Sequence, residues 1–313
     1  MQNRLKVFSG NSNRPLAEAI CSLLEVQIGG ALVGRFSDGE VRVEIHDNVR
    51  GMDVYVIQST CPPANENLVE LLVLIDALKR ASASRINVIV PYYGYGRQDQ
   101  KDKPRVSITA KVVADMLSVA GASRLISIDM HASQIQGFFK ISVEDLDGMT
   151  VLVDYVKKSL RGDEIVVAPD AGGVERARDF ASRLKVGLAI MDHRNADSAP
   201  YSRIVGNVAG HRVIILDDMV DTGRTLVRTV EGARVAGAAC IDACCFHAVF
   251  SGDSVEALQQ TSLNSLIVTD TIPASPKAAA CAMIERVSIA PMLAEVIKRV
   301  HFDESVSSMF SRR

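Results

Sequence analysis

The sequence lacks several features that mark specialised classes of protein. It contains no Trp, only 5% aromatic residues, and no apolar run near the ~18 residues of a membrane-spanning helix. The N-terminus has no apolar segment of the signal-peptide type. Cysteine is scarce, which fits a reducing compartment, and no second Cys pair stands at zinc spacing. Three of the six cysteines fall in the apolar run 240–250, which favours a buried strand over a metal site. We therefore expect a cytoplasmic protein without a membrane partner.

The charge balance excludes a second class of partner. Lys and Arg number 35 and Asp and Glu number 37, so the net charge is −2. Because no global positive field is present, nucleic acid is not an expected partner. If the substrates are polyanions, the cations that bind them must be local. The 313 residues are enough for two domains of about 150 residues each.

Short apolar segments alternate with segments of helical spacing along the whole chain, which predicts a parallel, doubly wound α/β architecture. Ligands of such sheets bind beyond the carboxyl ends of the strands. The polar stretches rich in Asp, His, Gly and Arg all follow strand candidates. The strand candidates are 5–9, 53–58, 86–90, 125–128, 165–168, 187–191, 213–216, 240–248 and 266–269, and the helix candidates are 15–24, 65–81, 109–120, 175–184, 226–236 and 290–300.

The most informative stretch is 212–225, which reads Arg-Val-Ile-Ile-Leu-Asp-Asp-Met-Val-Asp-Thr-Gly-Arg-Thr. We expect a buried strand over 213–216, then an acidic turn, a Thr/Gly loop and a helix. Backbone N–H groups at a helix N-terminus bind anions, and Gly223 lets the backbone approach a phosphate. The carboxylates suit sugar hydroxyls or Mg²⁺. One loop thus offers a phosphate site beside a diol or metal site, as a sugar phosphate requires.

Three further stretches carry candidate groups, each with a structural alternative. The loop 92–99 offers tyrosines, glycines and Arg97, which suits phosphate or a base, but it equally fits a solvated loop. His131 follows the strand candidate 125–128, and Asp170 follows 165–168, so the two can share a Mg²⁺ ion or the phosphates of a nucleotide. Taken alone, His131 is more typical of a hydrogen-bonded structural residue, and 169–173 is a turn.

Together these strings resemble one family along nearly the full chain. The 212–225 stretch resembles the 5-phosphoribosyl-diphosphate motif of type I phosphoribosyltransferases and of ribose-phosphate diphosphokinases. The strings Arg-Phe-Ser-Asp-Gly-Glu at 35–40, Pro-Tyr-Tyr-Gly-Tyr-Gly-Arg-Gln-Asp at 91–99 and His-Ala-Ser-Gln-Ile-Gln-Gly-Phe-Phe at 131–139 are similar to the second family alone. The chain therefore resembles a ribose-phosphate diphosphokinase (phosphoribosyl-diphosphate synthetase) of the common bacterial type.

The resemblance implies a fold and a reaction. It implies an α/β fold of two similar phosphoribosyltransferase-like domains, 1–146 on the ATP side and 147–313 on the ribose 5-phosphate side, with the last residues packing back on the first domain. It implies transfer of the diphosphoryl group of MgATP to ribose 5-phosphate, giving 5-phosphoribosyl 1-diphosphate and AMP. It also implies a homohexamer built from dimers, with ADP and phosphate as effectors.

The resemblance also assigns roles to residues. It assigns Mg²⁺ binding to His131 and Asp170, and catalysis to His193 and Arg194. It assigns ATP binding to Arg97 and Gln98, and also to Asp38, Gly39 and Glu40, which would reach across a subunit interface. The residues assigned to ribose 5-phosphate binding are Asn195, Asp217, Asp218, Asp221, Thr222, Gly223, Arg224 and Thr225.

The sequence departs from the family where catalysis is expected. The family's catalytic loop opens Asp-Lys-Arg-Arg-Pro-Arg, whereas this chain has His193 and Asn195 at the positions of the usual Lys and Arg, and the loop is about two residues shorter. Arg224 stands where a small residue is usual. A catalytically weak paralogue that binds the same ligands and regulates a true synthetase is therefore the alternative. A simple phosphoribosyltransferase is a weaker alternative, because the ATP-side strings argue against it.

Overall fold

The computed structural model describes residues 4–192 and 203–309. These divide into two compact units, each with its own sheet. Unit 1 comprises 1–147, 271–273 and 288–313, and unit 2 comprises 148–270 and 274–287. Among the described residues, no helix has both the length and the hydropathy that crossing a membrane requires.

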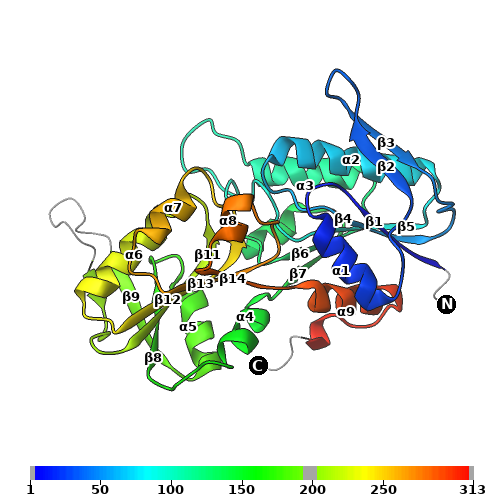
Figure 1. Cartoon of the computed structure of the whole chain (residues 1–313). Coiled ribbons are helices and arrows are strands. Elements are labelled where there is room, and N and C mark those ends of the chain that lie inside the picture. Colours follow the sequence, from blue (N-terminus) through cyan, green and yellow to red (C-terminus); the bar gives the residue numbers. More distant parts are fainter. Residues whose placement is uncertain (1–3, 193–202, 310–313) are drawn as a thin grey trace. The chain divides into compact units, whose positions relative to one another are not determined.

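Unit 1 is built on a five-stranded parallel sheet of order β1-β4-β5-β6-β7 (Figure 1). All five residues of β4 are buried, as expected of an interior strand covered on both faces. A separate antiparallel hairpin, β2–β3, packs along α2. The strands are β1 (Leu5–Ser9), β2 (Ala31–Arg35), β3 (Val41–Ile45), β4 (Asp53–Ile57), β5 (Arg85–Val90), β6 (Arg124–Ile128) and β7 (Ser142–Leu146).

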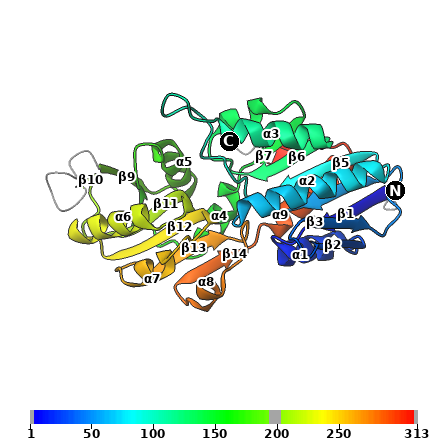
Figure 2. The ribbon, with the colours of Figure 1, turned by 90° about the horizontal axis from the view of Figure 1, so that it is seen from above.

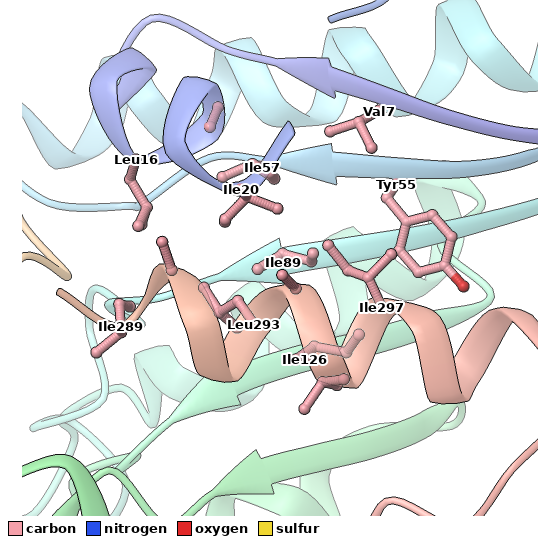
Figure 3. Close-up of a cluster of buried hydrophobic side chains, with 14 of the residues drawn as sticks. Val7, Leu16, Ile20, Tyr55, Ile57, Ile89, Ile126, Ile289, Leu293 and Ile297 are labelled. Atoms are coloured by element: carbon pink, nitrogen blue, oxygen red, sulfur yellow. The ribbon is translucent and has the colours of Figure 1, made fainter. Parts of the chain in front are cut away.

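Helices cover both faces of this sheet. α1 (Arg14–Leu24) and α9 (Ala290–His301) pack on one face, where Ile20 and Leu293 meet Ile57 of β4 in one apolar cluster (Figure 3). α2 (Ala64–Arg80) and α3 (Thr109–Ala120) pack on the other face. The last described α-helix of the chain, α9, thus completes the core of the first sheet.

A buried carboxylate anchors the end of α9. Asp53, 5% exposed, accepts hydrogen bonds from Arg85 Nε at 3.0 Å and Nη2 at 2.7 Å, and lies 2.7 Å from His301 Nδ1. Because a buried charge is tolerated only when it is well paired, this cluster fixes the first residue of β4 and the last of α9 together.

Unit 2 is built on a seven-stranded sheet of order β10-β9-β8-β11-β12-β13-β14, parallel except for the β10–β9 pair. α4 and α5 cover one face, and α6 and α7 cover the other (Figure 2). The strands are β8 (Glu164–Ala168), β9 (Gly187–Asp192), β10 (Arg203–Val205), β11 (Arg212–Val220), β12 (Cys240–Ala248), β13 (Ser265–Thr269) and β14 (Ile284–Val287). The helices are α4 (Met149–Val156), α5 (Val174–Leu184), α6 (Arg224–Val235), α7 (Ser254–Gln259) and α8 (Pro276–Ala280).

The predicted doubly wound α/β class is confirmed, and so is a buried strand for the cysteine-rich run 240–248. The expected acidic turn after residue 216 was wrong. β11 continues to Val220, because its ladder with β12 extends to the pair Val220–Ala248. Asp217 and Asp218 are therefore strand residues, and α6 begins at Arg224 rather than at Leu226.

Candidate active site

In unit 2, the carboxyl end of β11 presents the acidic residues. Asp217 is partly buried and lies opposite Cys245 of β12, while Asp218 is only 8% exposed. The Asp218 N–H donates to Asp217 Oδ1 at 2.9 Å. Arg176 of α5 reaches Asp218 Oδ2 at 3.8 Å, so the more deeply buried carboxylate has a cation beside it. Sequence reasoning missed Arg176, since nothing in local spacing links residues 176 and 218.

Asp217 has a raised proton affinity. Burial, and then the neighbouring Asp218 carboxylate, raise the pKa of Asp217 to about 8. Near neutral pH the free protein can therefore hold Asp217 protonated. A group that donates or accepts a hydrogen bond according to its protonation state suits a site for sugar hydroxyls.

This shifted pKa predicts a pH dependence of stability. Because the folded pKa lies above the ordinary 3.8 of aspartate, the contribution of Asp217 to stability is highest at low pH and is lost as the pH rises to about 8. We expect the loss of melting temperature between about pH 5 and about pH 9 to be smaller in Asp217→Asn than in wild type. Thermal unfolding across this range measures it, and equal pH slopes in the two proteins would contradict the assignment.

The loop after β11 has the geometry of an anion site. Gly223 is buried, adopts φ of +74°, and precedes the first residue of α6. This left-handed conformation favours glycine and turns the chain into the helix, whose first N–H groups lack intrahelical partners. Thr222, Arg224 and Thr225 are exposed around these N–H groups. The structure thus brings together at one strand end all of the predicted sugar-phosphate residues from 217 to 225.

Asp170 lies at a second strand end of unit 2. It is exposed, follows β8, the neighbour of β11 in the sheet, and contributes to the raised pKa of Asp217. Its Oδ1 accepts the Gly173 N–H at 2.9 Å, just before α5 begins. The structural reading of 169–173 as a turn is therefore correct, and the side chain is also held at the edge where ligands bind.

In unit 1, the loop 91–99 follows β5 and is held by two residues after β4. Thr60 Oγ1 accepts the Gly94 N–H at 2.7 Å, and Ser59 Oγ accepts the Tyr92 N–H at 3.1 Å. Sequence reasoning gave Ser59 and Thr60 no role, although hydroxyls directly after a buried strand were a usable signal. The loop is thus anchored, not merely solvated, while Arg97 and Gln98 remain exposed on it.

Gln98 and its neighbours connect this loop to the surrounding elements. Gln98 Oε1 accepts from Thr109 Oγ1 at 2.6 Å, at the start of α3. Asp99, 7% exposed, accepts from Gln134 Nε2 at 2.6 Å. His131 is exposed three residues before Gln134, and a Cβ on Gly96 would lie 3.6 Å from the His131 Cβ. The predicted ATP loop and the predicted metal ligand of unit 1 are therefore adjacent.

Asp38, Gly39 and Glu40 lie apart from that loop, at the tip of the β2–β3 hairpin, which projects from unit 1 (Figure 1). All three are exposed, and the Glu40 N–H donates to Asp38 Oδ1 at 3.0 Å within the turn. Gly39 adopts φ of +93°, a backbone conformation that favours glycine in the turn. Asp38 thus helps to form the turn, and both carboxylates lie exposed at its tip.

The predicted residues His193, Arg194 and Asn195 lie outside the described residues, so their roles stay predictions. Within 4–192 and 203–309, no three His, Cys, Asp or Glu side chains gather to hold a metal ion by themselves. Of the two predicted metal ligands, His131 belongs to unit 1 and Asp170 to unit 2.

Comparison with known proteins identifies the family. Residues 5–121 match the model of the N-terminal domain of ribose phosphate pyrophosphokinase, and residues 191–311 match the phosphoribosyl synthetase-associated domain. The chain is 47% identical over 310 residues to the ribose-phosphate pyrophosphokinase of Ralstonia nicotianae, covering 98% of both chains. The chain belongs to the ribose-phosphate pyrophosphokinase family.

Two further relatives of this pyrophosphokinase family agree with the assignment. Ribose-phosphate pyrophosphokinase 1 of Listeria monocytogenes is 48% identical over 310 residues, with 98% of this chain and 97% of that one covered. The crystal structure of phosphoribosylpyrophosphate synthetase from Mycobacterium smegmatis matches with a TM-score of 0.91 at 37% identity, covering 96% and 99% of the two chains. The resemblance first drawn from the motifs, and with it an enzyme of two phosphoribosyltransferase-like domains, is confirmed.

Proposed function

We propose that the chain is an active ribose-phosphate diphosphokinase that serves nucleotide biosynthesis. The anomeric oxygen of ribose 5-phosphate attacks the β-phosphorus of ATP, the bond from that phosphorus to the α–β bridging oxygen breaks, and AMP leaves. The hydroxyl proton is released, and 5-phosphoribosyl 1-diphosphate is the second product. The observation that carries this proposal is the β11–α6 loop, where carboxylates and the first N–H groups of a helix lie at one strand end.

Unit 2 binds the acceptor sugar in this proposal. The N–H groups around Gly223 and the hydroxyls of Thr222 and Thr225 hold the 5-phosphate. Asp217 and Asp221 accept hydrogen bonds from the ribose hydroxyls, which places the anomeric oxygen. Asp218 stays beside Arg176 and supports the strand end. Positioning of this kind supplies most of the rate in phosphoryl transfer, because the protein has little covalent work to do.

Unit 1 binds ATP in this proposal. Arg97 offers a guanidinium for phosphate or base, and Gln98 is fixed in place by Thr109. The exposed hairpin tip, with Asp38 and Glu40, serves the ATP site of a partner subunit. Phe36, 50% exposed on the same tip, fits a surface that a second copy covers. The family resemblance adds to this proposal a homohexamer built from dimers, with ADP and phosphate as effectors.

Mg²⁺ suits the donor set, because this ion commonly binds through one or two protein groups and completes its shell with substrate phosphates and water. His131 and Asp170 are the proposed ligands, and the ion would neutralise the charge of the triphosphate. Asp170 uses Oδ1 for the Gly173 N–H, and Oδ2 is the oxygen assigned to the ion in this proposal. A sparse pair of ligands is consistent with the absence of a three-residue cluster in the described ranges.

Removal of either ligand should raise the requirement for Mg²⁺. Asp170→Asn keeps an oxygen for the Gly173 N–H but removes the charge, and His131→Ala removes the imidazole. We expect the Mg²⁺ concentration at half-maximal activity to rise at least about tenfold in each variant. A Mg²⁺ titration at saturating ATP measures this, with the exposed Asp179→Asn on α5 as control. Unchanged titrations in both variants would remove these residues from the metal site.

The altered loop predicts slow turnover with a distinctive pH profile. Fixed cations near the migrating phosphoryl group are the main electrostatic aid available, and His193 replaces the family's Lys. We expect His193→Lys to raise kcat severalfold near pH 8, and wild type to gain activity at mildly acid pH, where the imidazole is charged. Steady-state rates of wild type, His193→Lys and His193→Ala, measured from mildly acid pH to about pH 8, test whether His193 supplies the catalytic cation. If Ala matches wild type throughout, the cation comes from elsewhere.

The alternative functions, a phosphoribosyltransferase or a regulatory paralogue, can be distinguished by the substrates that the protein consumes. A phosphoribosyltransferase would consume 5-phosphoribosyl 1-diphosphate with a nucleobase, whereas the proposed enzyme forms it from ribose 5-phosphate and ATP. Supplying each pair in turn and identifying products by chromatography separates the two. A regulatory paralogue would bind ATP and ribose 5-phosphate and convert neither. The near-full-length likeness of this chain to ribose-phosphate pyrophosphokinases favours the catalytic function over the regulatory one.

A further inference from the structure

The connection between β12 and α7 packs directly against the phosphate loop of unit 2. The Phe250 N–H donates to the Val220 carbonyl, and the Ser251 N–H donates to the Asp221 carbonyl, both at 3.0 Å. Phe250 and Gly252 adopt positive φ values of +49° and +61°, so this connection is a tight turn. Residues 250–254 thus pack against the start of the phosphate loop and hydrogen-bond to its backbone, and we call them the backing segment.

Ser254 ends the backing segment and touches the glycine of the loop. A Cβ built on Gly223 would lie 3.5 Å from the Ser254 Cβ and 3.6 Å from the Ser254 carbonyl oxygen. The Ser254 side chain is 2% exposed, and its Oγ has no hydrogen-bond partner among the described residues. Buried hydroxyls are nearly always paired, and an unpaired one destabilises the state in which it occurs.

We propose that Ser254 is a positioning residue for the 5-phosphate site. The hydroxyl that lacks a partner here gains one from the loop backbone when residues 221–225 close on a phosphate, since a hydroxyl can both donate and accept. Phosphate binding thereby satisfies a buried hydroxyl, which favours the closed arrangement of the loop. This inference rests on the proposed function, because it concerns the same sugar-phosphate site.

The test is Ser254→Ala, with Ser159→Ala as the matched control. Ser159 follows α4, is exposed, and bonds only to the Val156 carbonyl among the described residues. In Ser254→Ala we expect the KM for ribose 5-phosphate to rise about 2- to 10-fold, as the loss of one hydrogen bond implies, while the KM for ATP stays unchanged. The melting temperature without ligand should be equal or higher, and the rise on adding ribose 5-phosphate should be smaller.

The outcomes separate this inference from the proposed function. An unchanged KM and an unchanged ligand-induced rise in melting temperature would overturn it. A lower melting temperature without ligand, together with a normal ligand-induced rise, would also overturn it, because Ser254 would then be purely structural. If wild type itself shows no response to ribose 5-phosphate, the proposed function is wrong, and the Ser254 result is read separately with inorganic phosphate as the probe.

Discussion

Gly94→Ala is expected to remove most of the affinity for ATP. A Cβ at this position would lie 2.2 Å from the Thr60 carbonyl oxygen, far inside contact distance. Thr60 cannot retreat easily, because its N–H and its Oγ1 both donate to the Tyr92 carbonyl, at 3.0 and 3.1 Å. The loop must move instead, and it carries Arg97 and Gln98. A displacement of about 1 Å can reduce function about 100-fold.

Calorimetric titration with ATP measures this effect, and Gly137→Ala is the control. Gly137 also lies in unit 1, but a Cβ there would meet nothing within 4 Å, so ATP affinity should be retained. Titration of Gly94→Ala with ribose 5-phosphate shows whether unit 2 remains folded. Wild-type ATP affinity in Gly94→Ala would show that this loop does not position the nucleotide.

Asp217→Ala and Asp221→Ala should each weaken ribose 5-phosphate binding and spare ATP. Hydrogen bonds to charged groups contribute about 1.5–3 kcal/mol, which corresponds to about a 10- to 150-fold loss of affinity. The larger effect is expected at Asp221, because the raised pKa leaves Asp217 partly protonated near neutral pH. Calorimetry with each ligand separately measures both affinities.

Asp179→Ala is the control for this pair. Asp179 is an exposed carboxylate of unit 2 that pairs with Arg183 one turn along α5, so removing it should change neither affinity. Loss of ATP binding with intact ribose 5-phosphate binding in Asp217→Ala or Asp221→Ala would reverse the assignment of ligands to loops.

Most of the longer strands and helices were predictable because apolar runs and helical periodicity are local signals. The candidates did not include the short elements β7, β10, β14, α4, α7 and α8. The end of β11 was also not predictable from local signals. Asp217 and Asp218 look like a turn in the sequence, yet the backbone remains paired to β12 as far as Val220. Strand length there depends on the neighbouring strand, whose nine residues run from Cys240 to Ala248. Side-chain polarity alone therefore placed the strand end four residues too early.

The supporting residues of the site were unpredictable for a related reason. Arg176 and Asp218, or Ser254 and Gly223, are brought together by the crossovers of the sheet, and no spacing within one segment indicates the pairing. The proposed ligand-facing residues could be predicted because they cluster in short strings at strand ends. The residues that hold them come from other elements and emerge only from the fold.

The central claim is tested most directly by the products formed from ATP, Mg²⁺ and ribose 5-phosphate. Nucleotides and sugar phosphates are separated and quantified over time, with a reaction lacking ribose 5-phosphate as the blank. An active diphosphokinase releases AMP and 5-phosphoribosyl 1-diphosphate in equal amounts, and only when the sugar phosphate is present. Release of ADP in place of AMP, or tight binding of both substrates with no AMP at all, would contradict the assignment.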